Sequence, residues 1–208
     1  MTTEDTEFVV RSIAQTVVDH EKDFGDLDAA AGDGDFGFSL ARGFEVVLSD
    51  WDDYDRSDSA TFLKKVAQTL TKKIGGTSGP IWGTAFLRAA KTAEDREVDG
   101  TVVVEMLRAA VEGIQQRGKA ELGDKTLIDS IVPGTDALEQ AVQGGTDGAG
   151  GAKAFAEAAR KAAEDTAELQ ARRGRASYTG ERSKGSPDAG AMAVAIIAEE
   201  LTTRWNER

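Results

Sequence analysis

The sequence contains no cysteine, one histidine, three prolines and 6% aromatic residues. The absence of cysteine excludes disulfides and thiolate-bound metals. The lone histidine, His20, stands apart from every other motif and gives little support to a Ser-His-Asp hydrolase. No apolar run approaches the roughly 20 residues that a membrane-spanning helix needs, and the polar, acidic start Met1–Thr6 does not resemble a signal peptide. We therefore expect a cytoplasmic protein with no membrane partner.

Positive charge is also scarce. The chain has 25 lysines and arginines against 37 aspartates and glutamates, a formal net charge of −12. A protein that binds nucleic acid needs a basic face, so this balance argues against nucleic acid as a partner. An acidic protein can still bind anions where a metal ion or a local arginine supplies positive charge.

The property that the chain has in quantity is helical periodicity. From Val10 to Val17, for example, apolar residues recur at i, i+3, i+4 and i+7. No stretch alternates convincingly with the two-residue period of a strand. A length of 208 residues favours one domain, residues 1–208. These features predict an all-α fold, a bundle of about eight antiparallel helices.

The apolar stripes give approximate helix bounds. The first helix is predicted from about residue 3 to 22, ending at Phe24-Gly25. The other stripes cover residues 40–48, 62–70, 81–92, 103–114, 126–142, 155–169 and 194–205. The glycine-rich segment 144–151 and the polar segment 172–188 are predicted to be loops, and a structureless segment as long as the second is usually functional.

Connections that follow odd-numbered helices share one end of an up-and-down bundle. Four connections are of this kind: the aspartate-rich turn after the first helix, and segments 75–80, 118–126 and 172–188. We therefore predict that these four connections meet and build one site.

The first of these connections carries Asp28, Asp33 and Asp35 within eight residues, in the stretch LDAAAGDGDFG. The neighbouring glycines permit a turn that folds the three carboxylates toward one point. Such charges repel unless a hard cation is present, and Mg²⁺ prefers carboxylate, water and phosphate oxygens. The next helix begins just after the turn, which is a favourable place for phosphate. An acidic surface turn is the alternative, and this stretch alone leaves both open.

Two other connections have residues that suit phosphate. The run Gly76-Thr77-Ser78-Gly79 offers backbone N–H groups and two hydroxyls beside a helix start. Arg175 offers a planar guanidinium that matches phosphate oxygens. Taken singly, a capping turn and a solvated basic loop explain them more simply. Only their combination predicts a nucleotide site.

Two familiar motifs are excluded. Residues 113–120 nearly match a P-loop, but Ala120 stands where a serine or threonine must hold Mg²⁺, and the segment follows a helix instead of a strand. The aspartate stretch is not an EF-hand, because the twelfth residue counted from Asp33 is Phe44 and not glutamate.

Four segments together resemble one family, the nucleotide-binding L subunit of dihydroxyacetone kinase. They are LDAAAGDGD (27–35), GGTSGPIWGTAF (75–86), GDKTLID (123–129) and GRASYTGERS (174–183), in the family's order and across nearly the whole chain. The resemblance implies an eight-helix antiparallel barrel with the nucleotide at one end.

The resemblance also implies roles for individual residues. Asp28, Asp33 and Asp35 are expected to bind two Mg²⁺ ions that bridge the phosphates of ATP or ADP. The positions expected to contact the nucleotide are Thr77 and Ser78 in the phosphate loop, with Ser39, Gly118, Leu127, Arg175 and Asp188 to Gly190 around it. Arg175 is the candidate catalytic residue, because it can add positive charge at the transferred phosphoryl group.

One departure from the family pattern stands next to the aspartates. Members commonly have histidine after the third aspartate, where this chain has Phe36, and Phe38 is bulkier than the polar residue expected there. These changes predict a lost phosphate contact or a reshaped pocket, while the metal site is kept. Erythrulose or another short ketose is therefore a plausible acceptor beside dihydroxyacetone.

In the family, the ketose is bound covalently by a histidine of a separate K subunit or domain. This sequence contains no such domain, so we expect half of an enzyme that is active with a K-type partner. The hypothesis is phosphoryl transfer from the nucleotide to a ketose hydroxyl, with metal ions neutralising charge and the base supplied by the partner.

Several alternatives stay open at this stage. ATP is an exchangeable substrate in one, and in another bound ADP is rephosphorylated by a phosphotransferase-system protein. A third is a nucleotide-bound regulatory module without turnover. A generic acidic metal-binding bundle is disfavoured by the four ordered motifs.

Overall fold

The structure, a computed structural model, describes residues 2–208. Within that range, all regular secondary structure is helical. The α-helices are α1 (Thr3–Asp19), α2 (Glu21–Ala29), α3 (Phe36–Ser49), α4 (Ser59–Lys73), α5 (Ser78–Ala93), α6 (Gly100–Gly118), α7 (Ile128–Gln143), α8 (Gly148–Asp165) and α9 (Ala189–Asn206). Three 3₁₀ segments are η1 (Trp51–Asp53), η2 (Thr166–Glu168) and η3 (Arg175–Ser183). None of the described helices combines the length and the apolar character needed to cross a membrane.

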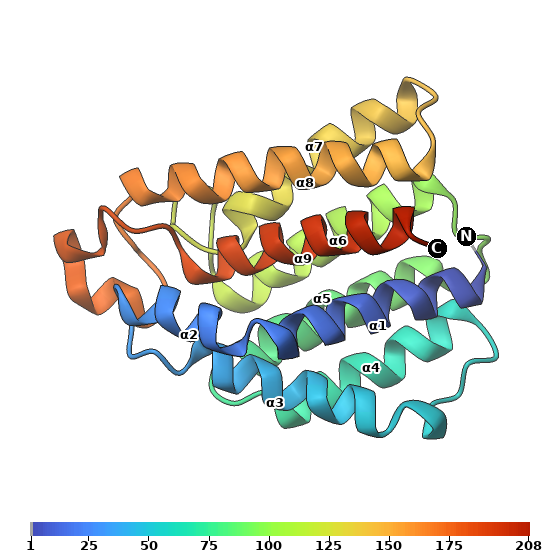
Figure 1. The fold of residues 1–208 in the computed structure, drawn as a ribbon, viewed down its shortest axis with the longest axis horizontal. Helices are drawn as coiled ribbons and strands as arrows, with labels where there is room; N and C mark the ends of the chain where they lie inside the picture. Colours follow the sequence, from blue (N-terminus) through green and yellow to red (C-terminus); the bar gives the residue numbers. More distant parts are fainter. Residues whose placement is uncertain (1) are drawn as a thin grey trace.

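The long helices form a closed ring. Each helix from α3 to α8 packs against the next one in sequence, so that the series ends at α9. Helix α1 completes the ring by packing against both α3 and α9 (Figure 1). The predicted all-α antiparallel barrel is confirmed. Counted as one interrupted helix, α1 and α2 take the place of the first of the eight predicted helices.

The first predicted helix boundary was wrong. The chain breaks at His20, but it then continues as α2 to Ala29, through the predicted end at Phe24-Gly25. Phe24 is fully buried in the core, and the His20 ring stacks on it at 5.9 Å. Burial of this aromatic side chain therefore holds α2 in place, and Asp28 lies in its last turn.

Two predicted loops contain more structure than expected. Helix α8 begins inside the glycine-rich segment, because the Asp147 carboxylate accepts a hydrogen bond from Gly150 N at 2.8 Å and caps the helix. A cap of this kind stabilises a helix by about 0.5–2 kcal/mol. Segment 172–188 holds η3, which is kinked at Gly180, where φ is 59°.

The main core lies between α1, α3, α4, α5 and α9, with α2 at one end. Its largest fully buried side chains include Phe24, Phe44, Phe62, Leu40 and Leu70. A smaller cluster joins α6 and α7 through Val111, Ile114 and Ile128. Burial of these apolar faces fixes the helix ends and therefore the connections that the ends carry.

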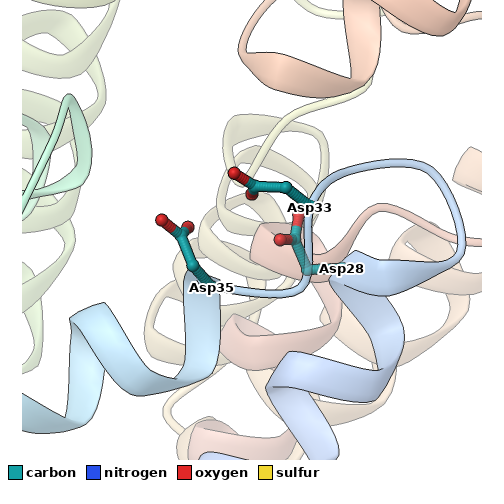
Figure 2. A group of neighbouring side chains, drawn as sticks. All are labelled: Asp28, Asp33 and Asp35. Atoms are coloured by element: carbon teal, nitrogen blue, oxygen red, sulfur yellow. The ribbon is translucent and has the colours of Figure 1, made fainter.

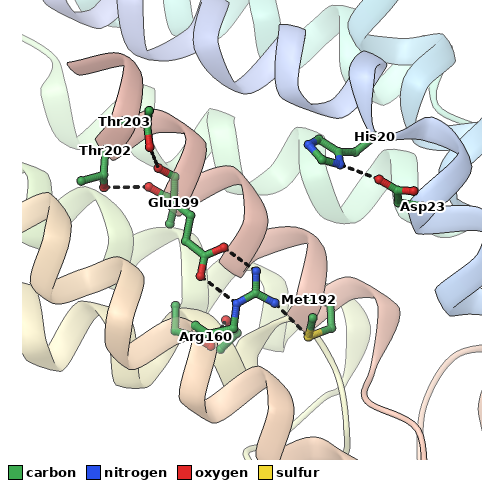
Figure 3. A network of polar contacts seen from close by, with 10 residues as sticks. His20, Asp23, Arg160, Met192, Glu199, Thr202 and Thr203 are labelled. Atoms are coloured by element: carbon green, nitrogen blue, oxygen red, sulfur yellow. Dashed lines mark hydrogen bonds and ion pairs between the residues drawn. The ribbon is translucent and has the colours of Figure 1, made fainter. Parts of the chain in front are cut away.

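Helices α8 and α9 pack closely through alanines, namely Ala163, Ala191 and Ala195. On the outer side of this pair, Arg160 Nε donates to Glu199 Oε1 at 2.7 Å, and its Nη2 pairs with Glu199 Oε2 (Figure 3). This two-pronged ion pair fixes the register between the two helices that flank segment 166–188.

Candidate functional site

The four connections that follow α2, α4, α6 and α8 lie at one end of the barrel, opposite the two chain termini (Figure 1). Contacts between residues far apart in the sequence link these connections. Arg175 Nη1 donates to Asp35 Oδ2 at 2.7 Å, and Arg172 N donates to Asp124 O at 3.0 Å. A Cβ placed on Gly75 would lie 3.7 Å from Ser39 Oγ. The predicted meeting of the four connections is therefore confirmed.

Asp28, Asp33 and Asp35 present their carboxylates to one another. Each offers an oxygen, and these three oxygens all lie within 4.8 Å of one another (Figure 2). Two ligands on opposite sides of one Mg²⁺ are about 4.2 Å apart, twice the usual Mg–O distance. The spacing suits one hard cation after a small side-chain movement, or two cations with shared water. The three residues thus fit the ions predicted for them.

The chain places these carboxylates through backbone contacts. Asp28 Oδ2 accepts hydrogen bonds from Gly34 N at 2.8 Å and, more weakly, from Phe36 N at 3.4 Å. Gly34 has φ of +78°, a conformation that side-chain-bearing residues rarely adopt. A Cβ on Gly32 would lie 2.3 Å from Asp28 Oδ1. The glycines therefore let the loop wrap around the Asp28 carboxylate.

Arg175 supplies positive charge to this cluster from the far end of the chain. Its Nη1 contacts the Oδ2 atoms of both Asp33 and Asp35. All three side chains are about half exposed, so solvent screens the pairs. The guanidinium therefore partly neutralises two of the three carboxylates that could hold a cation.

The phosphate-loop candidates begin α5. Thr77 is the N-cap residue of α5 and Ser78 its first residue, and the Thr77 side chain makes no capping hydrogen bond. The first N–H groups of a helix have no partner inside the helix and attract anions. Gly76, with φ of +61°, turns the chain into this helix, and a Cβ on it would lie 4.0 Å from Arg175 Nη2. The loop and the arginine are therefore neighbours.

The remaining predicted nucleotide contacts lie where helices begin or end. Ser39 is in the first turn of α3, Gly118 is the last residue of α6, and Leu127 is the N-cap of α7. A Cβ on Gly118 would lie 3.1 Å from Ile81 Cδ1, and one on Gly190 would lie 3.4 Å from Leu127 Cβ. The structure places Gly118 beside α5 and Gly190 beside Leu127.

Asp188 caps α9 from a desolvated position. Its Oδ2 accepts a hydrogen bond from Ala191 N at 2.8 Å. Desolvation raises the pKa of Asp188 to about 7, and the nearby Asp129 charge adds to the rise, while the Ala191 N–H and Lys125 oppose it. The group is therefore poised between its neutral and charged forms near neutral pH.

Asp129, the last residue of the 123–129 motif, has a structural role that was not predicted from the sequence. The buried Asp129 carboxylate accepts hydrogen bonds from Gly123 N at 2.6 Å and Thr126 N at 2.7 Å. It therefore folds the α6–α7 connection upon itself, just before Leu127. The spacing of Thr126 and Asp129, which matches the [ST]-x-x-[DE] capping pattern at a helix start, was the signal that could have found it.

The two aromatic departures from the family pattern behave differently. Phe36 packs against the main core, with its ring centroid 6.3 Å from that of Phe24. Phe38 is exposed, and the Arg42 guanidinium lies 4.9 Å from its ring centroid. The Phe36 ring therefore serves the α2–α3 contact, while the predicted lost phosphate contact or reshaped pocket stays a prediction.

Comparison with known proteins adds a family to this geometry. Residues 30–203 match the model of the DAK2 domain. The chain is 38% identical over 182 residues to the ADP-binding subunit DhaL of the PEP-dependent dihydroxyacetone kinase of Escherichia coli, covering 87% of each protein. It is 37% identical over 196 residues to an L-erythrulose 1-kinase of Mycolicibacterium smegmatis, covering 93% of this chain and 34% of that kinase.

A solved structure shares the fold. The dihydroxyacetone kinase from C. freundii, in complex with AMP-PNP and Mg²⁺, superposes with a TM-score of 0.77 at 26% identity. The match covers 94% of this chain and 33% of that kinase, so the chain spans about a third of its length.

The raised pKa of Asp188 predicts a pH-dependent stability. Between about pH 4 and about pH 7 the native state holds a proton that the unfolded chain releases, because the native pKa of about 7 exceeds the ordinary 3.8. The free energy of unfolding of the wild type should therefore fall with rising pH relative to that of Asp188→Asn, which keeps a capping oxygen but does not titrate. Urea unfolding across this window measures the difference.

The control for this prediction is Asp147→Asn. Asp147 caps α8 with the same kind of hydrogen bond but is exposed. Its difference from the wild type should stay nearly constant over the same pH range. Parallel stability curves for wild type and Asp188→Asn would contradict the assignment.

Proposed function

Since the chain belongs to the DAK2 domain family, we propose that it is the nucleotide- and Mg²⁺-binding subunit of a kinase that phosphorylates a short ketose. The observation that carries this proposal is the meeting of three carboxylates with an arginine 140 residues away from the third. Dihydroxyacetone and erythrulose are the acceptors that the matched relatives support. We also propose that residues 1–208 act as one domain, which the closed ring of helices supports.

Asp28, Asp33 and Asp35 would hold the metal, and two ions is the number that the family resemblance implies. When bound, Mg²⁺ neutralises charge on the phosphate oxygens of ATP or ADP. The Asp28 carboxylate is already fixed by two backbone N–H groups, so this ligand needs little reorganisation. Asp33 and Asp35 flank a glycine and can adjust around the ion.

The chain's own residues would then orient the nucleotide. Thr77 and Ser78 present a helix N-terminus to its phosphates. Ser39, Gly118, Leu127 and the segment from Asp188 to Gly190 would surround the rest of it. The α5 start lies beside Arg175, so phosphate held there is within reach of the guanidinium.

Arg175 is proposed to change partners during binding. Arg175 already pairs with the carboxylates of Asp33 and Asp35, which are also proposed as metal ligands, so the two cations would compete for them. With a cation on these carboxylates, the guanidinium would be free to pair with the phosphoryl group instead. In that position it stabilises the charge that develops during transfer.

A second protein is proposed to hold the ketose and to supply the base. The Escherichia coli relative is itself a subunit, and in the Mycolicibacterium smegmatis kinase the matching region is about a third of a longer chain. At the site end, Tyr178 is 90% exposed, and Phe38 and Leu122 are also exposed. Exposed aromatic and aliphatic side chains around a site suit contact with a protein partner. A K-type ketose-binding subunit is therefore our proposed partner.

For the phosphoryl donor, we favour bound ADP that is rephosphorylated in place by a phosphotransferase-system protein. The relative that matches this chain over most of both lengths carries ADP-binding and PEP-dependent in its name. An ATP-exchanging kinase subunit is the alternative, which is supported by the C. freundii kinase in complex with AMP-PNP, an ATP analogue, and Mg²⁺. The regulatory module without turnover is not proposed, because the relatives described above carry the names of kinases or kinase subunits.

Replacement of one metal ligand tests the proposal. Asp33→Ala removes a carboxylate oxygen from the cluster and leaves the core untouched, so Mg²⁺-dependent ADP binding should be lost while thermal unfolding stays close to that of the wild type. Isothermal titration with ADP and Mg²⁺ measures this. Asp26→Ala is the matched control, because Asp26 is exposed on α2 and pairs only with Lys22 among the described residues. Retained Mg²⁺–ADP affinity in Asp33→Ala would refute the metal site.

The partner change of Arg175 has its own test. Arg175→Met should strengthen binding of Mg²⁺ alone, because the competing guanidinium is gone, and weaken Mg²⁺–ADP binding roughly tenfold or more, because a charge-assisted contact is lost. Titrations with metal alone and with metal plus ADP separate the two effects. Arg182→Met, an exposed change nearby, serves as control. Equal loss of both affinities would contradict the exchange of partners.

The donor can be identified from the nucleotide that the protein retains. Denaturation of the purified protein followed by mass spectrometry should release ADP, and that ADP should fail to exchange with isotopically labelled ATP over the time of the assay. Empty protein, or rapid exchange with labelled ATP, would instead establish an ATP-dependent subunit.

A further inference from the structure

Arg175 stands on a segment that contains no α-helix, residues 166–188, which we call the arm. Hydrogen bonds fasten the base of the arm. Asp188 N donates to Thr166 Oγ1 at 2.8 Å, and Gly185 N donates to Ala167 O at 2.9 Å. These contacts close the arm into a loop, but they do not attach it to the rest of the site.

The attachment comes from Lys125, one of the most deeply buried charged side chains of the molecule. Lys125 is 2% exposed, and its Nζ donates to three backbone carbonyls of the arm. Leu169 O, at 3.1 Å, lies on the outgoing leg of the arm, while Ser183 O and Ser186 O, the latter at 2.7 Å, lie on the returning leg. An ammonium group has three N–H donors, so all three are used.

Asp124, the residue before Lys125, holds the outgoing leg. Its backbone oxygen accepts a hydrogen bond from Arg172 N at 3.0 Å, and its carboxylate accepts one from Arg173 Nε at 3.0 Å. Asp124 is buried, whereas Arg173 is exposed over 44% of its side chain. The attachment therefore ends two residues before Arg175, with Gly174 at φ of +65° between them.

The connection that carries Asp124 and Lys125 is built in advance for this contact. Lys125 has φ of +64°, a left-handed conformation that residues with a side chain rarely adopt. The two N–H groups that Asp129 accepts come from Gly123 and Thr126, on either side of Asp124 and Lys125. The two hydrogen bonds to Asp129 thus stabilise the unfavourable backbone conformation of Lys125, and this conformation places the Lys125 side chain beneath the arm.

A role for Lys125 in the chemistry does not fit these contacts. Its donors are all engaged by backbone carbonyls, and desolvation lowers the pKa of Lys125 although the nearby Asp188 charge acts to raise it. No ion pair within 4 Å joins it to a carboxylate in the part of the chain that the structure describes. Burial of an ammonium group is unfavourable unless its N–H groups are hydrogen-bonded, and here all three bond to one segment. The contacts therefore indicate that Lys125 holds that segment.

We propose that Lys125 and Asp124 form a clasp that fastens the arm to the α6–α7 connection and so positions Arg175 at the metal and phosphate site. Lys125 is then a positioning residue. The clasp itself is independent of the proposed function. Only the identity of the ligand near Arg175, a Mg²⁺-bound nucleotide, rests on the proposed function. Without the clasp, the arm opens from its base, Arg175 samples many positions, and bound nucleotide escapes faster.

Lys125→Met tests the clasp in the full chain. Hydrogen–deuterium exchange without nucleotide should be at least tenfold faster at arm amides 171–185 and unchanged in α1, α3 and α4. The dissociation rate of Mg²⁺–ADP should rise at least tenfold, while Mg²⁺ alone still binds. Lys119→Met is the matched control, because Lys119 lies in the same connection with φ of +54° but is exposed.

The outcomes separate the clasp from the proposed function. Equal arm exchange in Lys125→Met and Lys119→Met overturns the clasp, and so does faster exchange with unchanged ADP dissociation. Wild-type protein that binds no Mg²⁺–ADP overturns the proposed function, whatever the arm does. If Lys125→Met does not fold, Arg173→Met, changed at an exposed side chain, should still speed exchange at residues 171–176 at least threefold over Arg182→Met. No difference between those two variants overturns the clasp.

Discussion

Repulsion between three carboxylates is the constraint around which this end of the barrel is arranged. Two unit charges 4.8 Å apart repel by about 1 kcal/mol in a water-like dielectric and by about 3.5 kcal/mol at an effective dielectric constant of 20. The oxygens of Asp28, Asp33 and Asp35 lie within that distance of one another. Countercharge therefore has to be supplied, and the fold supplies it through Arg175. Asp33 and Asp35 are also two of the three proposed metal ligands, so the proposal links the charge balance of the free site to its chemistry.

The arm is the structural answer to this need. The guanidinium reaches the aspartates from the connection between α8 and α9, and α9 packs against α2, the helix that carries Asp28. A segment outside regular helix can cover that distance, but it loses conformational entropy when it is ordered. Buried carbonyl contacts to Lys125 and the Asp124 contacts offset that loss. The charge balance of the acidic cluster thus depends on the arm, and the position of the arm depends on the α6–α7 connection.

The acidic composition has more than one use in this molecule. Several aspartates begin helices by accepting backbone N–H groups, as Asp58, Asp99, Asp147 and Asp188 do for α4, α6, α8 and α9. One of these caps, Asp188, lies where Asp129 and Lys125 also act on its charge. A net charge of −12 is therefore compatible with an anion site, because the positive groups are placed individually and not as a basic face.

The sequence by itself determined the helical class, the approximate position of most helices, the order of the connections and the three carboxylates of the cluster. These features are local: periodicity, glycine position and residue type express them within a few neighbours. Tertiary structure alone decided that α2 continues past Gly25, because the burial of Phe24 outweighs the local helix-breaking tendency of the glycine. It also decided that Phe36 faces the core and that Lys125 lies beneath an arm more than 40 residues later in the chain. Such contacts depend on which distant surfaces meet after the ring closes, and no local pattern encodes them.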